Sequence, residues 1–218
     1  MTISIDLRER MSPVGDQGIR PTCVAFALTA CHELVYELSP KELSKDSLHW
    51  KSVCREASAN NGVSVTTAIL VLNEEGQHLE EDWPYIPDLD ELTWESLQPP
   101  KLNGKSVFKV ARGVSMRITD PNALLNILKT RGPIFMILPI WESFFLPQNG
   151  RIPMPETDSE EYRGLHAVSV VGLTNEGNPI IRNSWGTSWG NFGHGIMPFE
   201  YLRQYASNIY FLVPLGVR

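Results

Sequence analysis

Apolar residues recur at spacings of three and four along the first third of the chain, which is the pattern of amphipathic helices. The clearest case is 23–38, a stretch without Gly or Pro. Thr22 is predicted as its N-cap, because Pro21 prevents an earlier start. Two further helices are predicted, one within 40–54 and one over 64–75, and Gly76 is placed to end the second. The segment before Pro21 is rich in Gly and Pro and predicts an extended or looped chain.

The pattern changes in the second half of the chain. A connection rich in Pro and acidic residues covers 82–100, and 120–130 predicts a short helix with Asp120 as N-cap and Pro121 at the first position. Short β-rich runs follow at 134–138, 167–173 and 180–183, and the turn sequence at 175–178 separates the last two. Helices first and strands second predict an α+β fold with a helical lobe and a β lobe.

Composition narrows the class of protein. The chain has 218 residues, 42% of them hydrophobic, so it can bury a core, and wholesale disorder is excluded. Its formal charge of −6 argues against nucleic acid as a partner. The first twenty residues contain no signal-peptide core, and the longest apolar run, 133–141, is too short to cross a membrane. We therefore expect a cytoplasmic protein without membrane contact, unless a leader has been trimmed.

The three cysteines differ in their surroundings. Cys23 is predicted at the first turn of a helix, where the helix dipole favours a thiolate. A lone cysteine is more often a buried apolar thiol, and we assign that role to Cys31 and Cys54. No cysteine has a spacing typical of zinc ligands, and the acidic stretches at 88–91 and 156–161 are interpreted as solvated loops. We expect no metal and no cofactor.

Sequence blocks before and after Cys23 change its interpretation. Gln17 lies six residues before Cys23, His166 starts a predicted strand 143 residues after it, and Asn183 begins an Asn-Ser-Trp-Gly block. In this order the blocks resemble the papain-like cysteine peptidases. Segments 61–62, 80–85 and 132–150 also resemble that family, so the resemblance extends over nearly the whole chain.

The resemblance implies a papain-like two-lobe fold in a single catalytic domain over 1–218, with a left lobe mainly in 11–100 and a β-barrel-like right lobe mainly in 101–218. The active site would lie in the cleft between the lobes. There Cys23 would be the nucleophile, His166 the base and acid, Asn183 the group that orients His166, and Gln17 an oxyanion donor. The residues implied in substrate binding are Asn61, Gly62, Leu165, Ala167 and Trp185; Trp185 would also shield the Asn183–His166 bond from water.

The function expected is a cysteine endopeptidase that acts on protein or peptide substrates through an acyl-enzyme. Two alternatives remain open: another acyl-transfer enzyme on the same triad (a deamidase, a transglutaminase-like enzyme or a peptide ligase), and a catalytically silent binding module. The family usually has Cys-Gly-Ser where this chain has Arg20-Pro21-Thr22, and it usually has Trp where this chain has Val24. Leu165 replaces the usual Asp or Asn before the catalytic His.

The family's inhibitory pro-segment is not present in the sequence. We therefore expect control by a regulatory protein partner, a fused region or confinement. The other histidines are given no catalytic role: His32 and His49 are expected to be at the surface or half-buried, and His194 is expected to pack.

Overall fold

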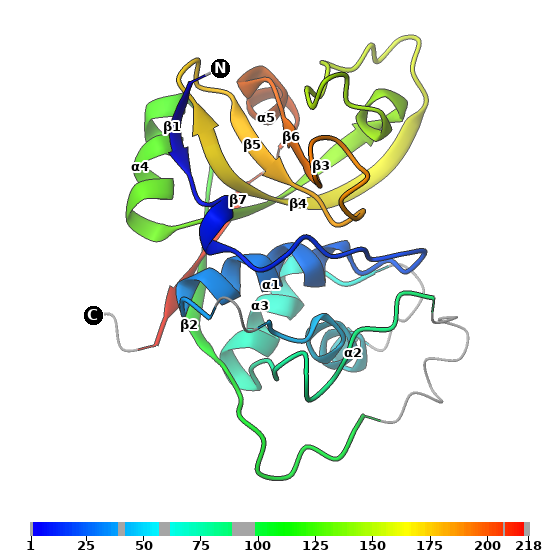
Figure 1. The fold of residues 1–218 in the computed structure, drawn as a ribbon, viewed down its shortest axis with the longest axis vertical. Helices are drawn as coiled ribbons and strands as arrows, with labels where there is room; N and C mark the ends of the chain where they lie inside the picture. The colour runs from blue at the N-terminus through cyan, green and yellow to red at the C-terminus, as the bar shows by residue number, and fades with distance from the viewer. Residues whose placement is uncertain (1, 39–41, 57–61, 89–98, 207, 216–218) are drawn as a thin grey trace.

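The computed structural model describes residues 2–38, 42–56, 62–88, 99–206 and 208–215. A group of helices lies on one side of the molecule, and an antiparallel sheet with two further helices lies on the other (Figure 1). This arrangement confirms the α+β prediction with a helical part and a β part. Asn61, one of the predicted substrate-binding residues, lies outside the described residues.

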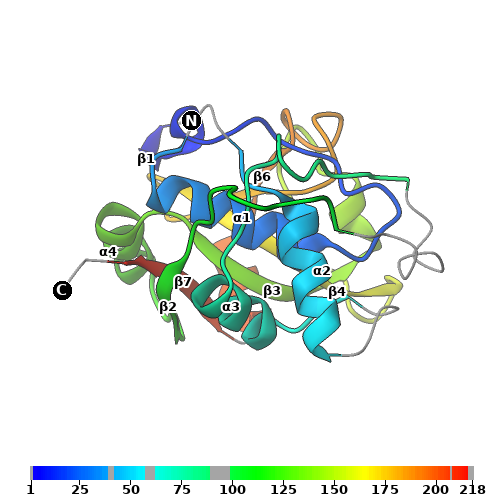
Figure 2. The same ribbon diagram turned by 90° about the horizontal axis from the view of Figure 1, so that it is seen from below.

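The helical side is built from α1 (Cys23–Val35), α2 (Lys45–Glu56) and α3 (Val65–Glu74), seen together from below in Figure 2. All three were predicted, with boundaries that differ by a few residues. At α3 the predicted start is confirmed in detail: the Ser64 hydroxyl accepts the Thr67 N–H at 3.2 Å, and Gly76 follows the helix with φ +75°. Apolar side chains from all three helices share a core with strands of the sheet.

Thr22 lies at the predicted N-cap position, but its side chain does not cap the helix. Thr22 is the N-cap residue of α1, yet its side chain makes no cap hydrogen bond. Its hydroxyl lies 2.7 Å from the Tyr85 hydroxyl instead. The side chain therefore ties the start of α1 to a distant loop rather than to its own first turn.

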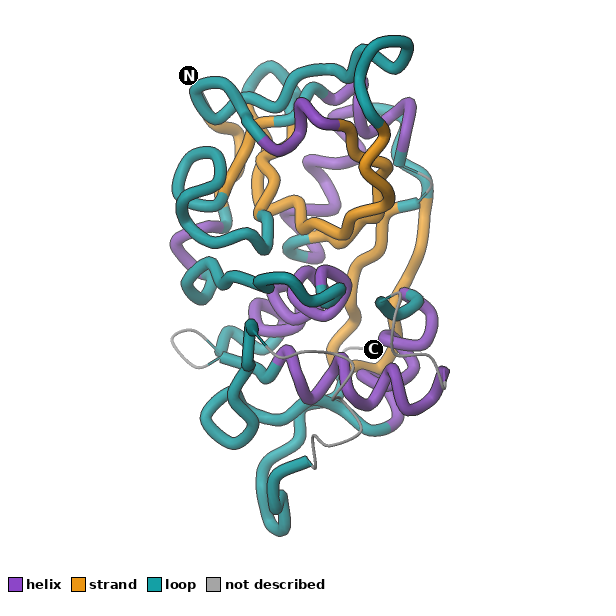
Figure 3. Tube along the Cα trace, turned by 90° about the vertical axis from the view of Figure 1, so that its right-hand side faces the viewer, coloured by secondary structure: helices purple, strands orange, loops and turns teal. Residues whose placement is uncertain are grey.

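The sheet side contains the strands β1 (Ile3–Asp6), β2 (Val110–Met116), β3 (Ile134–Trp141), β4 (Tyr162–Thr174), β5 (Pro179–Arg182), β6 (His194–Ile196) and β7 (Ile209–Pro214). Their order is β2-β7-β3-β4-β5-β6, with β1 paired to β4, and every pairing is antiparallel. The sheet curls strongly (Figure 3), but β2 and β6, at the two ends of the strand order, do not pair with each other, so the barrel is not closed. The three predicted strands are the central β3, β4 and β5.

Two helices cover the sheet, α4 (Pro121–Arg131) and α5 (Phe199–Tyr205). The predicted cap of α4 is confirmed, because the Asp120 carboxylate accepts the N–H groups of Asn122 and Ala123 at 2.9 and 3.0 Å. The second core fills the space between these helices and the strands. The face of the sheet that carries Ala167 instead packs on α1, so β4 contributes side chains to both cores.

Buried histidines correct two of the predictions. His32 and His49 were expected to be at the surface or half-buried, but they are fully buried, at 0% and 4% exposed. His32 lies inside the α1 packing and bonds the Gln77 side-chain oxygen at 2.9 Å. A polar partner on a distant segment lets a histidine occupy a core position, and periodicity within one helix cannot reveal such a partner. His194 is buried as expected, with Nδ1 2.9 Å from the Phe192 carbonyl oxygen.

Candidate active site

Cys23 lies at the first residue of α1, where the helix begins under the sheet. The backbone N–H groups of Ala167, Val24 and Cys23 act to lower the pKa of its thiol. The Ala167 contact is informative, because Ala167 directly follows His166 on β4. Burial raises the pKa of the Cys23 thiol, and the three N–H groups oppose that rise. The site therefore supplies donors that would stabilise a sulfur anion.

His166 is held on β4 in a fixed orientation. Its Nε2 lies 2.7 Å from the Asn183 side-chain oxygen, which also accepts the Ser184 backbone N–H at 2.8 Å. An oxygen that accepts both bonds requires the proton on Nε2, which leaves Nδ1 as the basic nitrogen. His166 is 5% exposed, and burial lowers its pKa to about 4. Burial therefore disfavours a Cys23 thiolate and a protonated His166 when either forms alone. A proton passed from Cys23 to His166 forms both charges together, and the two opposite charges attract each other.

Trp185 covers the His166–Asn183 pair. Its ring centre lies 4.6 Å from that of His166, and Phe145 stacks on it with centroids 4.7 Å apart. Phe144 contacts the same indole edge-on. This aromatic group is consistent with the predicted shielding of the histidine–asparagine bond, since exclusion of water strengthens a hydrogen bond.

Gln17 is fixed by contacts from two sides of the molecule. Its side-chain nitrogen donates to the Arg20 carbonyl at 2.7 Å, and its side-chain oxygen accepts the Ser184 hydroxyl at 2.6 Å. Its backbone N–H donates to the Ser184 carbonyl at 2.8 Å. The amide group has a second N–H, and Gln17 lines the same cleft as Cys23 and His166. An oxyanion donor would have to occupy this kind of position.

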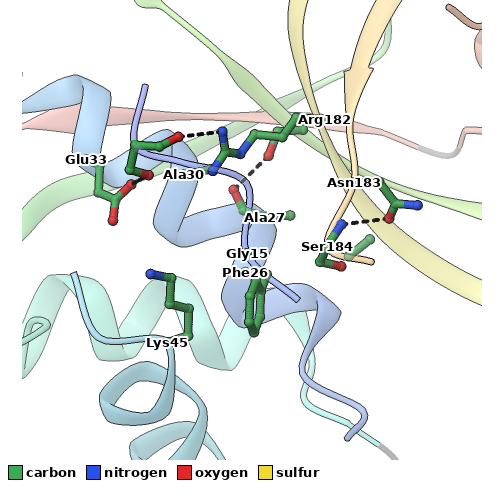
Figure 4. Close-up of a pocket in the computed structure, with 12 residues that line it drawn as sticks. Gly15, Phe26, Ala27, Ala30, Glu33, Lys45, Arg182, Asn183 and Ser184 are labelled. Atoms are coloured by element: carbon green, nitrogen blue, oxygen red, sulfur yellow. Dashed lines mark hydrogen bonds between the residues drawn. The ribbon is translucent and has the colours of Figure 1, made fainter. Parts of the chain in front are cut away.

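The segment before Gln17 is anchored beside a small interior pocket. Figure 4 shows Glu33 and Lys45 on the helical side of this pocket and Arg182 and Asn183 on the strand side. The Arg182 guanidinium donates to the carbonyls of Ser12 and Pro13 at 2.8 and 2.6 Å. Residues 12–13 are thereby tied to β5, the strand that ends immediately before Asn183.

A cleft of about 640 Å³ runs past Cys23 between the helical and sheet sides. It brings together Gln17, Cys23 and His166 with four predicted substrate-binding residues, Gly62, Leu165, Ala167 and Trp185. Asn183 lies behind His166 and does not line the cleft. Leu165 is 68% exposed, so a large apolar side chain stands at the edge of the cleft. Sequence reasoning did not identify several other lining residues, which are Glu56, Val63, Ser64, Ile137, Ile140, Phe145 and Arg163.

The environments of the two remaining cysteines differ. Cys31 is 1% exposed and fills the core as predicted, and burial raises its pKa to about 12. Cys54 was predicted to be a buried filler as well, but it is exposed on α2. The helical periodicity that placed Cys31 on an apolar face does not extend to Cys54, near the end of α2. All three cysteines are free thiols.

The described ranges contain no group of three or more His, Cys, Asp or Glu residues placed to hold a metal ion. In the same part of the chain, no helix is long and apolar enough to cross a membrane.

The fold and the cleft define a class: a two-part α+β protein in which a cysteine at the start of a helix lines the same cleft as a strand histidine that is bonded to an asparagine. Comparison with known proteins supports the same class. The profile described as "Papain family cysteine protease" matches residues 1–206, and the chain belongs to this family.

Individual relatives are distant but cover most of the chain. Cysteine proteinase 3 of Dictyostelium discoideum is 27% identical over 88% of this chain and 57% of its own length, and procathepsin L of Felis catus is 27% identical over 88% and 59%. The chain thus spans under two thirds of these relatives. Among solved structures, xylellain, a cysteine protease from Xylella fastidiosa, matches with a TM-score of 0.80 and 26% identity, covering 94% of this chain and 83% of that one.

Proposed function

We propose that the protein is a cysteine peptidase that hydrolyses peptide bonds through an acyl-enzyme on Cys23. The observation that carries the proposal is the position of the Cys23 sulfur at the start of α1. Cys23 lines the same cleft as His166, and the Asn183 side-chain oxygen holds His166 Nε2 at 2.7 Å. Membership of the papain family supports the same chemistry.

The proposed reaction assigns each step to a named residue. His166 takes the Cys23 proton, and the thiolate attacks the peptide carbonyl carbon. The Gln17 amide and the Cys23 backbone N–H donate to the oxyanion that forms. The C–N bond breaks as His166 returns the proton to the leaving amine. Water, deprotonated by His166, then attacks the thioester, and the C–S bond breaks to release the acid and restore Cys23.

The test is incubation of the wild type and Cys23→Ala with a diverse peptide library, analysed by mass spectrometry. Cys54→Ala is the matched control, because it removes an exposed cysteine that does not line the cleft. We expect cleavage by the wild type and by Cys54→Ala and none by Cys23→Ala. Mass shifts on glutamine side chains without chain cleavage would favour the transferase alternative, and absence of any Cys23-dependent product would favour the binding module.

A further inference from the structure

A buried ion pair lies beneath the loop that carries Gln17. Arg20 Nη1 and Asp46 Oδ1 are 2.7 Å apart, with side chains only 3% and 5% exposed. Both side chains also bond the same distant residue: Arg20 Nη1 donates to the Ile86 carbonyl at 2.9 Å, and the Ile86 N–H donates to Asp46 at 3.2 Å. The pair therefore joins three segments: the loop before α1, the start of α2 and the chain around Tyr85.

Tyr85 connects this ion pair to Gln17. The Arg20 guanidinium carbon lies 4.8 Å from the centre of the Tyr85 ring, a cation–π contact. The Tyr85 hydroxyl donates to the Gln17 backbone carbonyl at 2.8 Å. Because a hydroxyl has one proton, the 2.7 Å bond between Tyr85 and Thr22 has Thr22 as the donor. One phenol oxygen thus holds both ends of the 17–22 loop.

The arrangement continues to the side chain of Gln17, whose nitrogen donates to the Arg20 carbonyl. We propose that Arg20, Asp46 and Tyr85, named here the loop clamp, are positioning residues that hold the Gln17 amide where it stabilises the oxyanion. They touch no reacting atom and act only through Gln17 and the loop. The inference rests on the peptidase function proposed above.

Two features of the loop make such a clamp necessary. All three cysteines are free, so no disulfide fixes the loop, and Pro21 has no N–H to contribute to a hydrogen-bond ladder. A buried ion pair adds little net stability compared with apolar packing, because both charges must be removed from water. The ion pair instead holds the loop that carries Gln17 in one conformation.

The sharpest variant is Tyr85→Phe, which removes the hydroxyl but keeps the ring on Arg20 and against Phe26, whose ring centre is 4.8 Å away. We expect kcat for peptide cleavage to fall about 10-fold, less than the roughly 10²- to 10³-fold loss from deleting an oxyanion donor, with KM within twofold. The rate of Cys23 alkylation by iodoacetamide should stay unchanged, because that displacement forms no oxyanion. Tyr201→Phe is the matched control: it deletes a hydroxyl that bonds the Pro139 carbonyl at 2.9 Å on the far side of the sheet.

A double-mutant comparison with Gln17→Ala distinguishes positioning of the Gln17 amide from a general loosening of the loop. Gln17→Ala is measured in the wild type and in Tyr85→Phe, and we expect its effect on kcat to be at least fivefold smaller in the second background. Equal effects in both backgrounds, or an alkylation rate that falls with kcat, would overturn the clamp. Asp46→Asn should repeat the pattern, and Tyr85→Phe carries the test alone if that variant does not fold. A wild type that cleaves no peptide would overturn the peptidase proposal and the clamp together; an active wild type with additive variants would overturn the clamp alone.

Discussion

Ser184 holds Gln17 through two hydrogen bonds. The Ser184 hydroxyl donates to the Gln17 side-chain oxygen at 2.6 Å, and the Ser184 carbonyl accepts the Gln17 backbone N–H at 2.8 Å. The Ser184 N–H also bonds the Asn183 side chain. One serine therefore orients both the proposed oxyanion donor and the group that holds His166.

Ser184→Ala tests this link. It removes the hydroxyl donor and leaves both backbone bonds, so the Gln17 amide loses one of its two side-chain contacts. We expect kcat to fall about fivefold and the free energy of unfolding to fall by about 1 kcal/mol, the usual net value of one hydrogen bond. Steady-state kinetics and urea denaturation measure the two effects. Ser159→Ala, at an exposed serine bonded only within its own turn, should change neither; a stability loss with unchanged kcat would contradict the link.

Asn183→Ala should reduce turnover far more than stability. The variant removes the acceptor for His166 Nε2, so the imidazole can rotate or take the wrong tautomer. We expect kcat to fall about 100-fold, within the range of losses seen when general acid–base catalysis is impaired, with a Tm change of a few degrees. Asn183→Asp distinguishes orientation from charge, because it keeps the acceptor. Partial recovery of kcat in that variant is the expected result, and an Asp variant as impaired as Ala would argue against an orienting role.

The helices were predictable because their signals are local. Apolar spacing, Ser64, Asp120 and Gly76 all act within one or two turns of the chain. The strands β1, β2, β6 and β7 and the helix α5 were not identified, since a strand is stabilised by partners elsewhere. β2 pairs with β7 across about a hundred residues, from Val110 opposite Pro214 to Met116 opposite Ile209.

The candidate site shows the same division. Gln17, Cys23, His166 and Asn183 could be proposed because each belongs to a recognisable sequence block; in the structure the first three line one cleft, and Asn183 bonds His166. Glu56 and Arg163 were not found, because a cleft wall is assembled from segments whose proximity no single segment encodes. The loop clamp was not predicted for the same reason. Arg20, Asp46 and Tyr85 lie in separate segments, and only the fold places them in contact.

Buried histidines predict how stability depends on pH. Burial lowers the pKa of His32 to about 4, below the ordinary value near 6.5 of an unfolded chain. Between these values the unfolded state binds more protons, so the free energy of unfolding falls as pH drops from about 6.5 to 4. One such histidine contributes a slope of up to about 1.4 kcal/mol per pH unit.

Urea denaturation at pH 7 and pH 5 measures the effect. His32→Asn keeps a donor for the Gln77 oxygen but cannot take a proton in this range, so its stability should depend less on pH than that of the wild type. His78→Asn is a comparison at another buried histidine, whose pKa is also lowered by burial. The same pH dependence in wild type and His32→Asn would show that His32 is not among the groups responsible.

The three thiols should differ in their rates of alkylation because their environments differ. Burial raises the pKa of the Cys23 thiol, but Cys23 should still react first, at mildly acidic pH, because proton transfer to His166 in the proposed mechanism forms its thiolate. Cys54 is exposed, and partial burial and the Glu75 carboxylate raise its pKa, so it should react only as pH rises above about 8. Cys31, with its pKa raised to about 12 and 1% exposure, should react only after unfolding.

Iodoacetamide labelling from pH 5 to pH 9, with peptide mapping by mass spectrometry, gives the rate at each site. His166→Ala is the decisive variant: it removes the proton acceptor, so the Cys23 rate at pH 6 should fall at least 10-fold while the Cys54 rate stays the same. This internal reference separates loss of the ion pair from a general change in exposure. Cys23 labelling that matches Cys54 at every pH in the wild type would mean that the thiol is not activated, and the proposed nucleophile would lose its chemical basis.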